Sequence, residues 1–218
     1  MAPRSFLLSD ELHGYLQAHA APVDEIGQSL IDATAALGAV SGMQIAPDQG
    51  AFLALLVRTI GARRAIEVGT FTGYSALCIA RALPEDGTLL CCDVSDEWTS
   101  IGREHWKRAG VDHKVDLRIA PAIETLRALP TDASFDFAFV DADKPNYIAY
   151  IDEIVPRLRA NGLLLIDNVL WSGAVVDASN TDENTVAIRK TNDHVAAHPA
   201  LESVILSVAD GLTVARKG

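Results

Sequence analysis

The chain has 218 residues, of which 49% are hydrophobic and 22% are charged, a composition typical of a globular protein with a substantial core. Its formal net charge of −11 argues against a broad nucleic-acid-binding or anionic-membrane surface. No apolar run approaches the length of a membrane span, and the N-terminal residues lack the apolar core of a signal peptide. We therefore predict a single domain, residues 1–218, with neither nucleic-acid nor membrane partners.

The three cysteines are odd in number and lack the spacing of metal ligands. Cys91 and Cys92 lie within the apolar run "TLLCCDV", which predicts buried free thiols, and Cys78 stands apart from them. Free thiols are typical of a reducing compartment, so we expect a cytoplasmic protein.

The N-terminal part of the chain has the apolar spacing of helices. Residues 9–38 show this spacing with an interruption near Pro22, and residues 46–60 predict an amphipathic helix with Pro47 in its first turn. The expected apolar face of the second helix comprises Phe52, Leu55, Leu56 and Ile60. We expect residues 1–45 to form a helical segment that caps the domain.

From residue 64 onward, strand-like and helix-like segments alternate. The expected strands are 65–69, 88–94, 115–120, 135–142 and 162–168. The expected helices between them are 74–83, 96–109, 121–129 and 146–160. This alternation predicts right-handed crossovers and a parallel sheet with helices on both faces.

The C-terminal residues have a different pattern. After an expected helix at 182–198, "LESVILSVAD" and "GLTVARK" follow one another with only a tight connection at Asp210–Gly211, which predicts an antiparallel hairpin. The predicted fold is therefore an α/β, Rossmann-like, doubly wound sheet of seven strands. It is mixed, being parallel with a C-terminal antiparallel hairpin, and it is flanked by helices and preceded by N-terminal helices.

Polar side chains recur where the expected strands end. Asp141 follows the apolar run "FAFV", Asp93 ends the second strand, and Asp167 and Asn168 end the fifth. In a doubly wound sheet these ends share one edge, where ligands bind. Carboxylates gathered there repel one another unless a cation joins them. Hard oxygen ligands from Asp141, Asp167 and Asn168 favour Mg²⁺, with Mn²⁺ or Ca²⁺ as alternatives.

The turn after the first strand, "EVGTFTGYSA", suits a nucleoside-bearing ligand. Gly69 and Gly73 permit a tight turn, but the central glycine of the dinucleotide fingerprint is missing. Asp93 stands where an acid can accept hydrogen bonds from ribose hydroxyls, and Glu67 would repel a phosphate and attract an ammonium group. S-adenosylmethionine (SAM) fits this combination better than NAD. Two alternatives remain, namely simple strand-to-helix packing for the turn and helix capping for Asp93 or Asp143.

Four segments carry a resemblance to a known family: "AIEVGTFTGYSALCIARALPEDG", "FAFVDADKPNYIAYI", "LLLIDNVLWSGAVV" and "DGLTVARK". They resemble the cation-dependent class I O-methyltransferases, the family of caffeoyl-CoA and catechol O-methyltransferases and their small bacterial relatives. The similarity runs from about Met43 to the C-terminus. It implies cation-dependent transfer of the methyl group of SAM to a hydroxyl of a catechol-like small molecule, in an enzyme that forms homodimers.

The resemblance also implies roles for individual residues. Asp141, Asp167 and Asn168 would hold the cation, and Asp141 would take part in catalysis with Lys144. The implied SAM site comprises Met43, Ile45, Glu67, Gly69, Thr70, Ser75, Asp93, Ala122, Asp141 and Asp143.

On the substrate side, Lys144 would act on the acceptor hydroxyl, as a base if neutral or by stabilising the oxyanion if charged. Trp171 and Ser172 would face the substrate. The alternative for Lys144 is a solvent-exposed lysine without a role in catalysis. The alternative for Trp171 is an aromatic residue that only packs within its loop. Ser172 stands where plant caffeoyl-CoA enzymes carry asparagine, and residues 1–45 show no clear basic patch. A small free catechol, a hydroxylated phenylpropanoid or a flavonoid is therefore favoured over a CoA thioester.

Two rival functions belong to other classes. One is an NAD-linked Rossmann reductase, which the missing glycine disfavours and which leaves Asp167 and Asn168 unexplained. The other is a SAM-binding protein without catalysis, which predicts binding of SAM without turnover.

Overall fold

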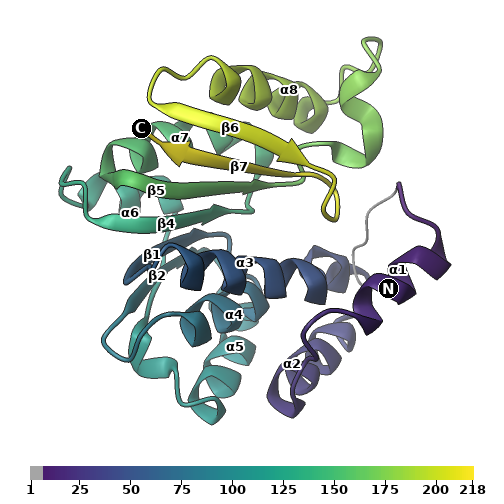
Figure 1. The fold of residues 1–218 in the computed structure, drawn as a ribbon, viewed down its shortest axis with the longest axis vertical. Helices are drawn as coiled ribbons and strands as arrows, with labels where there is room; N and C mark the ends of the chain where they lie inside the picture. The colour runs from purple at the N-terminus through teal and green to yellow at the C-terminus, as the bar shows by residue number, and fades with distance from the viewer. Residues whose placement is uncertain (1–6) are drawn as a thin grey trace.

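The computed structural model describes residues 7–218, in which a seven-stranded sheet lies between two layers of helices (Figure 1). The strands are β1 (Arg64–Val68), β2 (Thr88–Asp93), β3 (Val115–Ile119), β4 (Phe135–Val140), β5 (Leu158–Asp167), β6 (Leu201–Leu206) and β7 (Leu212–Lys217). The α-helices are α1 (Asp10–Ala18), α2 (Glu25–Ala35), α3 (Pro47–Thr59), α4 (Tyr74–Ala82), α5 (Asp96–Arg108), α6 (Ala122–Ala128), α7 (Tyr147–Arg157) and α8 (Glu183–Ala196). Short 3₁₀ helices are η1 (Gly38–Met43), η2 (Asp112–Lys114), η3 (Lys144–Asn146) and η4 (Trp171–Val176).

The order of the strands is β3-β2-β1-β4-β5-β7-β6. Strands β1 to β5 run parallel, and β7 lies antiparallel between β5 and β6. The chain winds outward in one direction from β1 and in the other from β4, so the sheet has a switch point between these two strands. This arrangement confirms the predicted doubly wound mixed sheet, and it places the ligand-binding crevice at the ends of β1 and β4.

The central strand β4 is buried on both faces, as its unbroken apolar sequence predicts. Phe137 and Phe139 pack into a core with α3, α4 and α5, whereas Ala138 and Val140 pack into a second core with α6, α7 and α8. All four side chains are fully buried. Because the two cores hold β4 rigidly from both sides, the residues that follow Val140 start from a fixed position.

Some expected boundaries were wrong. Strand β4 ends at Val140, so Asp141 lies beyond the strand, and β5 begins at Leu158 where a helix was expected to continue to residue 160. Of the apolar face expected for residues 46–60, Phe52, Leu56 and Ile60 pack against the core as predicted, but Leu55 was wrong because it is 59% exposed. Leu53 and Val57, which the expected face did not include, are fully buried. Helix α3 packs against α4 through the face that carries Leu53 and Val57.

The described part of the N-terminal segment is helical as predicted, and residues 1–6 of that segment lie outside the described residues. Helix α2 buries Leu30 against the core, whereas α1 buries none of its residues and lies at the periphery (Figure 1). Within residues 7–218, no helix combines the length and apolar character that crossing a bilayer requires. Cys91 and Cys92 are buried free thiols, as predicted, and Cys78 is free and half-buried.

Candidate active site

A cavity of about 1390 Å³ opens at the carboxyl ends of β1, β2, β4 and β5. Its walls come from the loops after these strands, from residues 42–49 before and at the start of α3, and from residues 171–185 before and within α8. All the predicted site residues except Glu67 line it: Met43, Ile45, Gly69, Thr70, Ser75, Asp93, Ala122, Asp141, Asp143, Lys144, Asp167, Asn168, Trp171 and Ser172. The fold therefore brings together residues that lie far apart in the sequence.

Lys144 lies at the centre of the polar end of the cavity. Its Nζ donates to Asp141 Oδ1 at 3.1 Å, to Asn168 Oδ1 at 2.6 Å and to the Tyr147 hydroxyl at 2.6 Å. Nζ also lies 5.7 Å from the centre of the Trp171 ring. The side chain is only 8% exposed, so the alternative of a solvated lysine is wrong. An ammonium group has three donors, and the three oxygens around Nζ satisfy all of them.

Asp167 is held on both of its carboxylate oxygens. Oδ2 accepts a hydrogen bond of 2.8 Å from Gln49 Nε2, and Oδ1 accepts one of 2.7 Å from the backbone N–H of Asn168. The side chain is nearly inaccessible, and burial together with the nearby charge of Asp141 raises the pKa of Asp167 to about 7. A neighbouring positive charge would favour the ionised form of this carboxyl group.

The oxygens at the ends of β4 and β5 suit a hard cation. Among residues 7–218 no three His, Cys, Asp or Glu side chains cluster as metal ligands. The predicted set instead combines two carboxylates, Asp141 and Asp167, with the amide of Asn168, and all three line the cavity. Asn168 adopts a left-handed backbone conformation with φ of 59°, which asparagine tolerates better than most residues. The set contains only oxygen donors, the type that Mg²⁺, Mn²⁺ and Ca²⁺ prefer.

The turn after β1 approaches the end of β4 so closely that it requires glycine. Gly69 has φ of +87°, and a Cβ at this position would lie 1.9 Å from the carbonyl oxygen of Asp141. Gly73, with φ of +82°, ends the turn, and a Cβ there would lie 2.4 Å from the Trp106 ring. The turn therefore brings the backbone after β1 against the residue that begins the polar end of the cavity.

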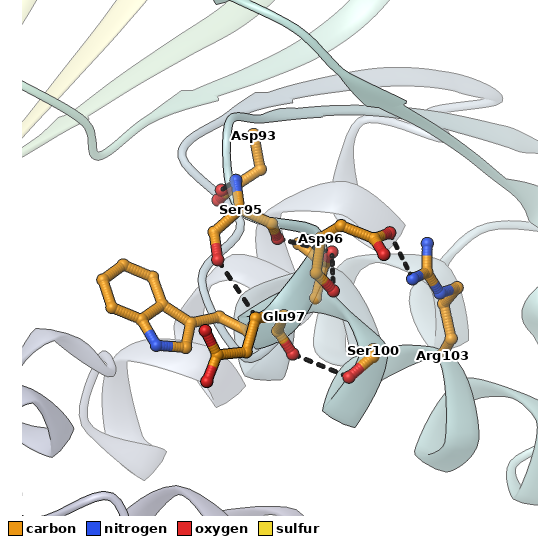
Figure 2. A network of polar contacts seen from close by, with 8 residues as sticks. Asp93, Ser95, Asp96, Glu97, Ser100 and Arg103 are labelled. Carbon is orange, nitrogen blue, oxygen red and sulfur yellow. Dashed lines mark hydrogen bonds and ion pairs between the residues drawn. The ribbon is translucent and has the colours of Figure 1, made fainter.

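The Asp93 carboxylate accepts hydrogen bonds from two loops, and Figure 2 shows it beside Ser95 at the start of α5. Its Oδ2 accepts from the backbone N–H groups of Thr70 and Phe71 at 2.8 and 2.7 Å, and its Oδ1 accepts from Ser95 N at 2.8 Å. Ser95, rather than Asp93, caps α5, because Ser95 Oγ accepts from Trp98 N at 3.1 Å. The helix-cap alternative for Asp93 is therefore wrong, and lone pairs remain on its carboxylate for a ligand hydroxyl.

Two other acids differ in their relation to the cavity. Asp143 accepts from the Tyr150 hydroxyl at 2.6 Å and from Asn146, and it makes no capping bond to η3. Glu67 lies beneath the turn, fully buried, and does not line the cavity; Cys91 Sγ donates to its Oε2 at 3.6 Å. Burial raises the pKa of Glu67 to about 8. Glu67 can therefore act on a ligand only from below the turn.

Sequence reasoning missed four side chains of this region. Gln49 and Tyr147 contact the polar end. Tyr147 lies in the quoted segment "FAFVDADKPNYIAYI", but neither residue was assigned a role. Phe71 and Trp98 line the end near Asp93 and form an edge-to-face pair with ring centres 5.2 Å apart. Phe71 lies in the quoted turn "EVGTFTGYSA", and Trp98 lies near the start of the helix expected at 96–109, so these positions are the signals that could have identified them.

The chain matches known O-methyltransferases in sequence and in structure. A family model described as O-methyltransferase matches residues 17–218. Tricin synthase 1 of Oryza sativa subsp. japonica is 43% identical over 188 residues, covering 80% of this chain and 75% of that protein. Caffeoyl-CoA O-methyltransferase 2 of Zea mays is 37% identical over 225 residues, covering 98% and 85%.

Solved structures agree with these sequence matches. The O-methyltransferase from Bacillus cereus in complex with SAH has a TM-score of 0.88 at 29% identity, covering 95% of this chain and 97% of that chain. TomG from Streptomyces achromogenes, an O-methyltransferase in complex with SAM, has a TM-score of 0.86 at 29% identity, covering 95% and 96%. The family match extends over nearly the whole chain and decides against the NAD-linked reductase. The chain therefore belongs to the SAM-dependent class I O-methyltransferase family.

Proposed function

We propose that this O-methyltransferase transfers the methyl group of SAM to one hydroxyl of a small aromatic acceptor with vicinal hydroxyls, and that it requires a divalent cation, magnesium by preference. The observation that carries the proposal is the convergence of Asp141 Oδ1 and Asn168 Oδ1 on Lys144 Nζ, with Asp167 adjacent in sequence to Asn168. These groups face a cavity of about 1390 Å³, which has room for both a nucleoside donor and a small acceptor.

The donor would occupy the side of the cavity formed by the turn after β1. Asp93 would accept hydrogen bonds from the ribose, and Glu67 would favour the ammonium group of SAM from beneath when it is ionised. The start of α4 offers backbone N–H groups to the donor's carboxylate. The other residues proposed to surround SAM are Met43, Ile45, Gly69, Thr70, Ser75, Ala122, Asp141 and Asp143.

The cation would be held by Asp141, Asp167 and Asn168. When bound, it supplies Lewis acidity that lowers the pKa of the acceptor hydroxyl and fixes the orientation of both vicinal oxygens. Gln49 and the backbone of Asn168 hold Asp167 in place from the protein side.

Lys144 would serve the acceptor hydroxyl. If Asp141 and Asn168 held the cation, Lys144 Nζ would lose two of its three hydrogen-bond acceptors. It would keep the third, the Tyr147 hydroxyl, which would orient the amine. The amine can then hold the hydroxyl proton or stabilise the oxyanion. As the acceptor oxygen bonds to the methyl carbon, the carbon–sulfur bond breaks and SAH leaves as the neutral thioether. Trp171 and Ser172 would contact the acceptor ring.

The experiment is a methyl-transfer assay with SAM and methyl caffeate, an uncharged catechol ester, in Mg²⁺ or after chelation with EDTA. We expect a methylated product that disappears on chelation and returns when Mg²⁺ is restored. Turnover that survives thorough chelation would refute the cation requirement. Intact SAM binding without methylation of methyl caffeate, caffeate or catechol would refute the acceptor class.

We also propose that the chain acts as one domain, with residues 1–45 as its cap, and that it forms a homodimer in a reducing cytoplasm without nucleic-acid or membrane partners. The apolar side chains of α1 support association, since Leu12, Tyr15 and Leu16 are 56%, 61% and 46% exposed. The free thiols support the compartment. Sedimentation velocity tests the dimer, and a monomer at micromolar concentration would contradict it.

A further inference from the structure

Residues 171–185 contribute one wall of the cavity, on the β5–β7 side of the switch point. In Figure 1 this segment is the green stretch that connects β5 to α8. The guanidinium of Arg189, on α8, donates hydrogen bonds to backbone carbonyl oxygens of this segment. It donates to Val175 and Asn180 at 2.9 Å, to Ala174 at 3.0 Å and also to Asp177. These four hydrogen bonds from one guanidinium add to the backbone hydrogen bonds of η4 and of the turns that follow it, and together they give the wall a defined shape.

Both ends of the wall are fastened as well. At its start, Ser172 N donates to Asp210 Oδ1 at 2.5 Å. At its end, Asp182 caps α8 and accepts from Asn184 N and Thr185 N at 3.0 and 3.1 Å. The hydrogen bonds therefore hold the segment so that its side chains, Trp171 among them, face the cavity in fixed positions.

The side chains that the wall presents are polar and either neutral or negative. Asn180, Asn184 and Thr185 supply amides and a hydroxyl, and Asp177 supplies a carboxylate. Hydrogen bonds from Ser179 hold the pKa of Asp177 below its usual value.

The rest of the lining has the same sign of charge. Within residues 7–218, Lys144 is the one lysine or arginine that lines the cavity. The acids that line it are Asp93, Asp141, Asp143, Asp167, Asp177 and Asp210. A bound dication and the sulfonium of SAM offset part of this charge at the reacting end, but they leave the acceptor wall unchanged.

We propose, resting on the proposed function, that the wall of residues 171–185 selects uncharged hydroxylated aromatic acceptors over polyanionic acyl-CoA thioesters. The phosphates of a CoA group would meet Asp177 and side-chain amides, where binding of such groups ordinarily uses lysine or arginine. An uncharged acceptor can accept and donate hydrogen bonds along the same wall without electrostatic cost. This preference would separate the chain from its relatives that are named caffeoyl-CoA O-methyltransferases.

The test uses three acceptors that share one catechol ring and differ in charge: methyl caffeate, caffeate and caffeoyl-CoA. With saturating SAM and Mg²⁺, we expect kcat/KM to fall in that order, with methyl caffeate at least about tenfold above caffeoyl-CoA. Added salt should narrow the gap, because it screens charges that are not in contact. A kcat/KM for caffeoyl-CoA equal to or above that for methyl caffeate would overturn the proposal.

Reversing the charge of Asp177 tests whether the preference between the acceptors arises at the wall. Asp177→Lys should raise the ratio of kcat/KM for caffeoyl-CoA to that for methyl caffeate several-fold. Asp112→Lys makes the same change in net charge at an exposed residue of η2 that does not line the cavity, and it should leave the ratio unchanged. Equal shifts in both variants would mean that net charge, rather than the wall, sets the preference.

Arg189→Met tests the fixed shape of the wall. We expect a higher KM for methyl caffeate with unchanged Kd for SAM, because the carbonyls of residues 174–180 lose their common donor. Arg103→Met removes an exposed arginine that pairs with Asp96 on α5, and it should change neither constant. An unchanged KM in Arg189→Met would contradict the role of Arg189.

A binding measurement separates this proposal from the proposed function. The SAH-loaded protein is titrated calorimetrically with methyl caffeate and with caffeoyl-CoA in Mg²⁺. Tighter binding of methyl caffeate without turnover would sink the proposed function and leave the wall's selectivity standing. Equal or tighter binding of caffeoyl-CoA would overturn the selectivity, and binding of neither would overturn both.

Discussion

The side-chain amide of Gln49 donates a 2.8 Å hydrogen bond to Oδ2 of Asp167, joining the first turn of α3 to the last residue of β5 across 118 positions of sequence. Gln49 is fully buried, and its Oε1 has no partner among the described side chains and backbone. The packing of α3 therefore fixes the orientation of one of the proposed cation ligands.

From this contact we predict that Gln49→Met lowers the affinity for Mn²⁺ by about 10- to 100-fold, the usual effect of losing a group that orients a metal ligand. Binding of SAH should be unchanged. Calorimetric titration of the SAH-loaded protein measures both. Gln44→Met is the matched control, since Gln44 is also buried and lines the cavity, and its side chain is not bonded to Asp167. Equal losses in the two variants would contradict the specific role of Gln49.

Lys144→Met should separate turnover from cation binding. We expect kcat to fall by about 10²- to 10⁴-fold, because the acceptor hydroxyl loses its proton partner. The affinity for Mn²⁺ should rise, because the amine no longer bonds to Asp141 Oδ1 and Asn168 Oδ1. Lys114→Met removes another buried lysine, one that donates to the carbonyl of Leu83, and should change neither quantity. Wild-type kcat in Lys144→Met would exclude the lysine from proton transfer.

The buried acid Glu67 predicts a stability that depends on pH. Burial raises its pKa from 4.5 to about 8, so the folded protein keeps a proton that the unfolded chain releases between these values. The stabilisation is complete below pH 4.5 and is lost as the pH rises through 8, with a slope of up to about 1.4 kcal/mol per pH unit. Urea unfolding of the ligand-free protein in EDTA between pH 5 and 8 measures it.

Glu67→Gln should remove that contribution, because glutamine keeps the shape and stays neutral. Asp167, whose pKa is also raised, adds a slope of the same sign, so the difference between the wild type and Glu67→Gln is the quantity to compare. A pH dependence identical in the two proteins would show that Glu67 does not titrate in this range.

Gly69→Ala should prevent or severely weaken folding. A Cβ at this position would lie 1.9 Å from the Asp141 carbonyl oxygen, a distance that only movement of the backbone can relieve. Gly61→Ala is the matched control, since Gly61 also has a positive φ, of 61°, but a Cβ there would meet nothing within 4 Å. We expect about 1 kcal/mol of destabilisation in the control and several times more in Gly69→Ala, measured by urea unfolding. Similar losses of stability in the two variants would mean that the strain of a positive φ, rather than the clash with Asp141, accounts for the destabilisation.

The sequence predicted the sheet and most of the cavity because both depend on local patterns. The apolar run of β4, the hairpin at Asp210–Gly211 and the acids at the strand ends are all visible within a few residues. Since parallel strands end at one edge, the grouping of Asp141 with Asp167 followed from the fold class alone.

What the sequence could not predict depends on contacts between distant elements. The buried face of α3 is centred on Leu53 and Val57, which pack in one core with residues of α4, and Leu55 therefore lies in solvent although Phe52, Leu56 and Ile60 pack as expected. The pairing of Gln49 with Asp167 and the exclusion of Glu67 from the cavity lining are of the same kind. Each requires knowing how two elements pack, which no periodicity of one segment reveals.

The reversal of strand order between β1 and β4 has a consequence for how such enzymes diversify. Gly69, Thr70 and Asp93 of the proposed SAM site lie at or after the ends of β1 and β2, whereas residues 171–185 follow β5 on the other side of the reversal. Mutation can thus reshape one half of the pocket while the other remains intact. Grafting residues 171–185 from a relative, together with its equivalent of Arg189, is accordingly the shortest route to an enzyme that keeps its methyl donor and acquires a new range of acceptors.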